Sequence, residues 1–172
     1  MIAHRRHVVG TLAVVLLSTG CGLGTQFRAA TEPQGGARAR LRVVATDTIV
    51  KLTPGKACHD GGPNTGVILS NGLGSHGFRG RSLGMPGKVE GRNFAEVYVE
   101  AGKPLSLVFL KGNDAGKLGC DVSLSFRPEA GKDYEATVSL LKVSTDRTLC
   151  VATAIELGTT ERVAYTGAPP CE

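Results

Sequence analysis

The chain has 172 residues, with 20 lysines and arginines, 15 aspartates and glutamates, 24 glycines and no tryptophan. This length fits one domain with short flanking segments, and the mild positive charge gives no reason to expect nucleic acid as a partner. The high glycine content favours turns and short strands over long helices.

Residues 1–20 have the organisation of an export signal. The basic residues Arg5 and Arg6 come first, an apolar run extends from Val8 to Leu17, and small residues follow up to Gly20. A basic start, a short apolar run and small residues are typical of a cleaved secretory signal. A membrane-spanning helix would need roughly 20 apolar residues. We therefore expect export and removal of residues 1–20.

The stretch LSTGC, from Leu17 to Cys21, resembles the bacterial lipobox, although Ser18 stands where that motif usually has leucine. The resemblance implies that Cys21 is acylated on sulfur, becomes the mature N-terminus and is then acylated on nitrogen. Three acyl chains would hold the protein firmly, because each buried CH₂ contributes roughly 0.8 kcal/mol. Gly22 follows, where enterobacterial lipoproteins kept at the inner membrane often have aspartate. The resemblance therefore implies an outer-membrane anchor facing the periplasm. The alternative is a secretory signal cut elsewhere, with Cys21 a free thiol.

Residues 22–40 show no hydrophobic periodicity and consist mainly of glycine, alanine and polar residues, with Pro33 among them. Such a composition predicts a flexible tether. We therefore expect the folded domain to span residues 41–172.

From residue 41 onward, the chain alternates between strand-like runs and glycine turns. Residues 41–52 form one such run, whose apolar phase shifts near Asp47, and a β-bulge would explain that shift. Strict alternation predicts half-buried strands at 120–126 and 134–140. Composition predicts further strands at 66–70, 94–100, 105–110, 150–157 and 161–166.

Turn sequences separate these runs, namely TPGK, MPGK, DAGK and two copies of EAGK. Their glycines can adopt the positive φ that tight turns require. Short, regularly spaced strands without helical periodicity predict an all-β fold. We expect a single antiparallel β-sandwich, Ig-like or related, stabilised by disulfides.

Residues 70–93 interrupt the strands with a stretch rich in glycine and basic residues. Loops of this length in a compact domain are usually functional or disordered. Basic side chains here would contact lipid phosphates or peptidoglycan carboxylates, and the alternative is a solvated loop that keeps a sheet edge soluble. The candidate binding residues are His76, Arg79, Arg81, Lys88 and Arg92.

Four cysteines follow Cys21, and an even number in an exported chain predicts disulfides. Three connectivities are possible, and the sequence alone does not choose among them. We favour Cys120–Cys150, which would close a loop of about 30 residues and contribute about 3–4 kcal/mol. The second pair would then be Cys58–Cys171, which would attach the C-terminal tail to the body. No CxxC pair is present, so we expect no metal site.

The sequence CHDGG sets Cys58, His59 and Asp60 side by side. Nucleophilic catalysis needs cysteine and histidine brought together in space rather than in sequence, so we interpret this stretch as a turn with a disulfide. Residues 72–77 match G-x-G-x-x-G, but the following FRGRSLGMPG cannot form the helix that a dinucleotide site requires. Scattered acidic residues give no paired carboxylates for glycoside hydrolysis. We expect no catalytic residues and no cofactor.

A wider resemblance covers about 50 residues of the C-terminal part. The residues that carry it are Cys120, Phe126, Pro128, Ala130, Gly131, Tyr134, Cys150 and Cys171. This pattern is similar to that of a group of small uncharacterised proteobacterial lipoproteins. The resemblance supports the Cys120–Cys150 pairing and says nothing about activity.

These observations favour an outer-membrane lipoprotein that works by binding, with an accessory or envelope-maintenance role. Its expected partners are the membrane, reached through the N-terminal lipid, and an envelope protein, lipid head groups or peptidoglycan. One alternative is a periplasmic lysozyme inhibitor, although lysozymes are basic like this chain and would be repelled. Another is an enzyme acting on glycan or peptide, which would need an indispensable group among His59, Asp60 and His76.

Overall fold

The computed structural model describes residues 27–71, 76–89, 93–112, 118–144, 148–159 and 162–172, so Cys21 and the export signal lie outside the described part. No helix in these ranges is long and apolar enough to cross a bilayer. The described chain forms strands β1 Arg38–Val44, β2 Thr48–Pro54, β3 Gly66–Leu69, β4 Phe94–Glu100, β5 Leu105–Gly112, β6 Leu118–Phe126, β7 Asp133–Lys142 and β8 Thr148–Glu156.

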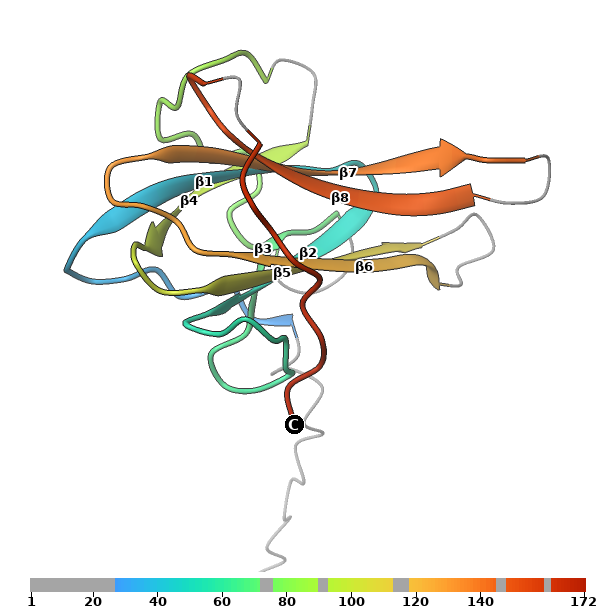
Figure 1. The fold of residues 1–172 in the computed structure, drawn as a ribbon, viewed down its shortest axis with the longest axis horizontal. Helices are drawn as coiled ribbons and strands as arrows, with labels where there is room; N and C mark the ends of the chain where they lie inside the picture. Colours follow the sequence, from blue (N-terminus) through green and yellow to red (C-terminus); the bar gives the residue numbers. More distant parts are fainter. Residues whose placement is uncertain (1–26, 72–75, 90–92, 113–117, 145–147, 160–161) are drawn as a thin grey trace, which may run out of the picture.

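The strands form two four-stranded sheets that lie face to face as two layers (Figure 1). One sheet has the order β4-β1-β7-β8 and the other β3-β2-β5-β6. This confirms the all-β prediction, but the sheets are not purely antiparallel. Strand β1 pairs in parallel with β7. The chain reaches β7 from β6 in the other layer, and β7 then runs in the same direction as β1. The other strand pairs are antiparallel.

The core lies between the layers. It is built from the inward-facing side chains, which alternate with outward-facing ones along the strands. Leu41 on β1 faces inward beside Val97 on β4, and Phe109 and Leu124 face them from the second sheet. The rings of Phe126 and Tyr134 meet with their centroids 5.3 Å apart. The alternation predicted for 120–126 is confirmed, because its apolar residues belong to this core or pack against it. The alternation predicted for 134–140 is confirmed from Tyr134 to Val138 but is wrong at Leu140, which is exposed.

The predicted continuous strand at 41–52 is two strands in different sheets. Strand β1 ends at Val44 and β2 begins at Thr48, and the chain turns between the layers at a corner where Asp47 has φ of 49°. The apolar phase shift near Asp47 therefore marks a change of sheet rather than a β-bulge. The two sheets face the core from opposite directions, so the side of the chain that points to the core changes at this corner.

Part of the predicted tether belongs to the folded body. Ala29 forms a parallel bridge with Val67 on β3, and Ala30 is buried in the core. The N–H of Ala30 donates to the Val67 carbonyl over 2.9 Å. Gly66 makes this approach possible, because a Cβ there would lie 2.3 Å from Ala30 Cα. The body therefore includes residues 28–30, well before the boundary expected at residue 41.

The C-terminal segment crosses from one sheet to the other as a strap rather than as the strand expected at 161–166. Arg162 bridges Ile155 on β8, and Thr166 bridges Ser125 on β6. Figure 1 shows this segment, in red, running from the upper layer to the lower one. Because β6 and β8 are the edge strands on this side, the strap occupies backbone groups that would otherwise be open to another chain.

Both favoured disulfides are present. Cys58 pairs with Cys171 at a Cα–Cα distance of 5.0 Å and holds the end of the strap. Cys120 on β6 pairs with Cys150 on β8 at 5.9 Å and connects the two layers at their common edge.

Candidate functional site

The loop that the sequence predicted as the binding surface is folded against the body. The N–H of Phe78 donates to the Ile68 carbonyl over 2.7 Å, and the backbone carbonyl of Arg81 accepts from the N–H of Glu96 on edge strand β4. The Arg81 guanidinium forms an ion pair with Glu32 at 3.0 Å and lies over the Phe78 ring. Arg81 is therefore occupied by internal contacts.

The other candidate residues of this loop have different surroundings. His76 is exposed, with its Nδ1 3.4 Å from the Ser70 carbonyl oxygen, and Arg79 and Lys88 are exposed as well. Arg92 lies outside the described residues.

A buried arginine explains why residues 82–88 lie across the outer face of the first sheet. Arg42 projects from β1 away from the core, and its Nε donates to Glu96 Oε1 over 2.8 Å. Its Nη2 contacts the same oxygen at 2.7 Å and the Met85 carbonyl at 2.9 Å. Its Nη1 reaches the Pro86 carbonyl at 2.8 Å and Glu135 at 3.2 Å. The guanidinium therefore makes four hydrogen bonds and one further close contact with the Glu96 carboxylate.

Glu96 completes this network from β4. Its Oε2 accepts from the backbone N–H groups of Leu83 and Met85. Burial alone would raise the pKa of Glu96, but the Leu83 N–H and the Arg42 guanidinium outweigh burial and hold the pKa below its usual value. The carboxylate therefore stays ionised and clamps the loop. The sequence-based prediction did not include this role, although RARLR at 38–42 places arginines at every second position, which is the period of a strand.

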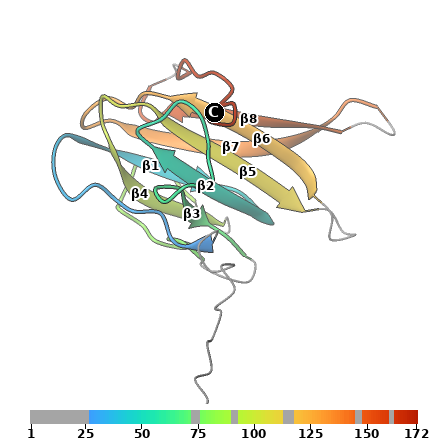
Figure 2. The ribbon, with the colours of Figure 1, turned by 90° about the horizontal axis from the view of Figure 1, so that it is seen from below.

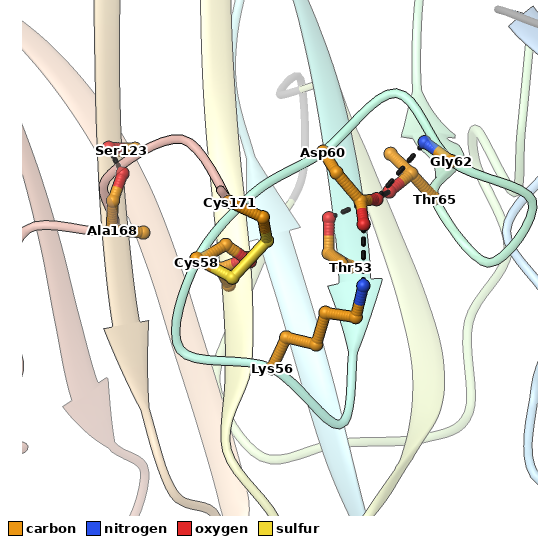
Figure 3. The surroundings of a disulfide bond; sticks show 10 residues. Thr53, Lys56, Cys58, Asp60, Gly62, Thr65, Ser123, Ala168 and Cys171 are labelled. Carbon is orange, nitrogen blue, oxygen red and sulfur yellow. Dashed lines mark hydrogen bonds and ion pairs between the residues drawn. A yellow bond between two sulfur atoms is a disulfide. The ribbon is translucent and has the colours of Figure 1, made fainter.

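The CHDGG stretch is a fixed corner, as expected (Figure 3). Asp60 accepts hydrogen bonds from Lys56 Nζ at 2.6 Å, from Thr65 Oγ1 at 2.8 Å and from the Gly62 N–H at 3.1 Å. These bonds, that of Lys56 first, lower the pKa of Asp60 to about 2. A general acid at neutral pH needs a raised pKa instead, so Asp60 is unsuited to that role.

The remaining groups of this corner are also used structurally. Cys58 is oxidised in its disulfide, and its carbonyl accepts from Ser106 Oγ at 2.8 Å. The backbone of His59 donates to Pro169 and accepts from Cys171, each over 2.9 Å. The corner therefore joins the strap to the second sheet.

A pocket of about 240 Å³ opens next to this corner, at the end of the sandwich where β2 and β4 finish and β5 begins. The buried side chains of Leu52, Val99 and Leu105 are the apolar part of its lining. The remaining lining residues are Thr31, Glu32, Pro33, Pro54, Gly55, Asn64, Tyr98, Glu100 and Pro104. Ligand sites for whole small molecules usually measure roughly 300–1,000 Å³, so this pocket matches a single side chain better.

The acidic residues at this pocket already have partners. Glu32 Oε1 accepts from the Tyr98 N–H over 2.7 Å, while its Oε2 pairs with Arg81. Glu100 pairs with Lys103 at 2.8 Å. Because these charges are paired, a group that entered the pocket would contact mainly its apolar lining. The exposed residues Thr31 and Asn64 can form hydrogen bonds at its rim.

Several constraints hold the pocket walls in place. Arg28 donates to the Thr65 and Gly62 carbonyls, so the N-terminal segment braces the loop that carries Asn64. Pro33, Pro54 and Pro104 restrict the backbone in the surrounding segments. A preformed pocket binds at a lower entropic cost than one that must be ordered. No local pattern in the sequence marks this pocket, because its residues come from separate segments that only the fold brings together.

Within the ranges that the structure covers, no three or more His, Cys, Asp or Glu side chains are grouped to hold a metal ion. Neither a family model nor a curated protein matches this chain.

Proposed function

We propose that this chain is an outer-membrane lipoprotein, anchored through Cys21, that binds a partner in the periplasm and performs no catalysis. Two disulfides support residence in an oxidising compartment. The signal-like residues 1–20 and the lipobox-like sequence before Cys21 support export and anchoring.

The pocket bounded by Leu52, Val99 and Leu105 is the observation that carries the binding role. Its walls are braced, its lining is largely apolar, and its carboxylates are paired within the protein. The occupant with matching chemistry is one apolar side chain on a segment of another envelope protein. Hydrogen bonds from that segment to Thr31 and Asn64 would set its orientation.

Site-specific photo-crosslinking in cells tests this proposal. A photoreactive residue at Asn64 should give a discrete partner band, and Asp121, exposed on the outer face of β6, is the matched control position. Adding Thr31→Trp should narrow the mouth of the pocket and abolish the Asn64 band without altering the core. A photoreactive residue at Arg79 tests whether the basic loop contacts a partner instead.

The outcomes separate the possible binding surfaces. A band from Asn64 that Thr31→Trp removes would support the pocket. A band from Arg79 alone would move the binding surface to the basic loop. Bands of equal strength from Asn64 and Asp121, or no band from Asn64, would overturn the proposed role of the pocket.

A further inference from the structure

The hairpin of β7 and β8 exposes a group of large apolar side chains near its tip. Leu140 is 49% exposed, Leu141 and Val143 are each 51% exposed, and Leu149 is 40% exposed. Figure 1 shows this hairpin projecting from one end of the two layers. Leu140 continues the inward alternation of β7, so its exposure departs from the predicted half-buried pattern.

The register places these side chains on both faces of the hairpin. Leu141 is opposite Leu149, and Leu140 is opposite Cys150. Neighbouring residues point to opposite faces of a strand. Leucines therefore lie on either side of the tip, whereas an ordinary solvated sheet surface has polar residues on its outer face.

The charge of this tip is basic. Residues 138–144 and 148–152 include Lys142, which is exposed, and no acidic residue. The connecting residues 145–147 lie outside the described part and add one aspartate and one arginine, which balance. Apolar side chains beside a lysine are complementary to the interface of an anionic bilayer, where the lysine can reach lipid phosphates.

The disulfide Cys120–Cys150 holds this hairpin close to its tip. Cys150 lies directly across from Leu140, and its bond to β6 ties the hairpin to the second sheet. The disulfide therefore restricts the apolar tip before it binds, so little conformational entropy is lost on binding.

The anchor of the proposed function would hold the whole domain within reach of a bilayer, and the present inference rests on that function. The N-terminal segment lies beside β3, at the sheet edge away from β6 (Figure 2). The body begins at Arg28 and Ala29, so only six peptide links separate Cys21 from Phe27. Such a link reaches about 20 Å at most. A tether over residues 22–40, as expected from the sequence, would have allowed a much larger separation.

We propose that the tip formed by Leu140, Leu141, Lys142, Val143 and Leu149 inserts into the interface of an anionic lipid bilayer as a second membrane contact. The leucines and the valine leave water for the boundary of the acyl chains, and Lys142 binds lipid phosphate. The short link from Cys21 raises the effective concentration of the tip at the bilayer, so a weak contact suffices.

The absence of tryptophan from the chain allows a direct test. Leu141→Trp introduces a single reporter at the tip, and Ile155→Trp introduces one on the outer face of β8 nearer the body, where Ile155 is also exposed. Both are measured in vesicles of phosphatidylethanolamine and phosphatidylglycerol that contain a lipid-borne quencher. A Cys21→Ser version of each chain, added from solution, reports on the hairpin without the lipid.

We expect the Leu141→Trp emission to shift to the blue and to be quenched, and the Ile155→Trp emission to change little. High salt or phosphatidylcholine vesicles should weaken the effect in the Cys21→Ser chain. Leu141→Asp with Val143→Asp should lower vesicle binding of the Cys21→Ser chain about tenfold or more. Lys142→Gln, a surface change that leaves packing intact, should reduce the salt dependence.

Equal quenching of both reporters, or none at Leu141→Trp, would overturn the proposal. A Leu141→Trp signal that depends on protein concentration without vesicles would assign the tip to a second copy of the chain instead. Failure of the anchor is distinguishable, because Cys21→Ser would then leave the amount of protein in the membrane fraction unchanged, while the tip variants would still lower it.

Discussion

Arg42 and Glu96 form an ion pair on the outer face of a sheet, and each is only 1% exposed. The sandwich core lies on the other side of β1 and β4, so residues 82–88 provide the burial. A stretch that looks like a solvated loop in the sequence thus covers two charges and is held in place by them.

Arg42→Met should destabilise the protein by about 3–5 kcal/mol, because it leaves Glu96 ionised and buried without its partner. Chemical denaturation measures this loss. The control is Arg40→Met, since Arg40 pairs with Asp133 at 2.6 Å but has a side chain that is 33% exposed. That change should cost about 1 kcal/mol. Equal losses for the two variants would contradict burial of the Arg42 charge.

Gly66→Ala should detach the N-terminal segment from β3, because the new methyl group would meet the Ala30 backbone. The hydrogen bond from the Ala30 N–H to Val67 should open, and hydrogen exchange at Ala30 should become faster. Unfolding should become easier by about 1–3 kcal/mol. Gly61→Ala is the control, since a Cβ at Gly61 meets nothing within 4 Å. Unchanged exchange at Ala30 would show that the segment is not held there.

Asp60→Asn should change how stability depends on acid pH. The pKa of Asp60 is lowered from 3.8 to about 2 by Lys56, Thr65 and Gly62. A lowered carboxyl pKa stabilises the fold above the unfolded-state value, and that contribution is lost as pH falls through the folded-state value. The variant should melt below the wild type at pH 5–7, and the two should converge between about pH 4 and 2. Parallel curves across this window would exclude a lowered pKa.

Intact mass spectrometry of the membrane fraction checks the anchor and the disulfides together. The expected mass is that of residues 21–172 with three acyl chains, and reduction should add four hydrogens for the two disulfides. A mass without lipid would make Cys21 an ordinary residue and would remove the proposed anchor. A gain of only two hydrogens would show that only one of the two disulfides is formed.

Local patterns were sufficient to identify most strands. The alternation in 120–126, and that in 134–140 as far as Val138, reports burial directly, because side chains of a strand point to opposite faces with a period of two. The composition of FAEVYVE predicted β4 over the same residues, 94–100, that the structure shows. Both EAGK copies are turns in which Gly102 and Gly131 have positive φ. The count of cysteines predicted two disulfides.

The candidate sites depend on contacts between distant parts of the chain, and the sequence carries no local signal for such contacts. The pocket combines residues from 31–33 with residues up to Leu105. The basic residue Arg81 pairs with Glu32 across 49 positions of sequence, so its charge did not reveal its role.

The sequence by itself determined the all-β class, most strand positions, the glycine turns and the presence of two disulfides, because these follow from short-range periodicity and composition. Only the tertiary structure decided that the chain changes sheet at Asp47, that β1 and β7 are parallel, and that residues 28–30 belong to the body. It also decided that Leu140 is exposed. Which sheet a strand joins depends on free energy summed over contacts far apart in the chain, and that sum exists only after folding.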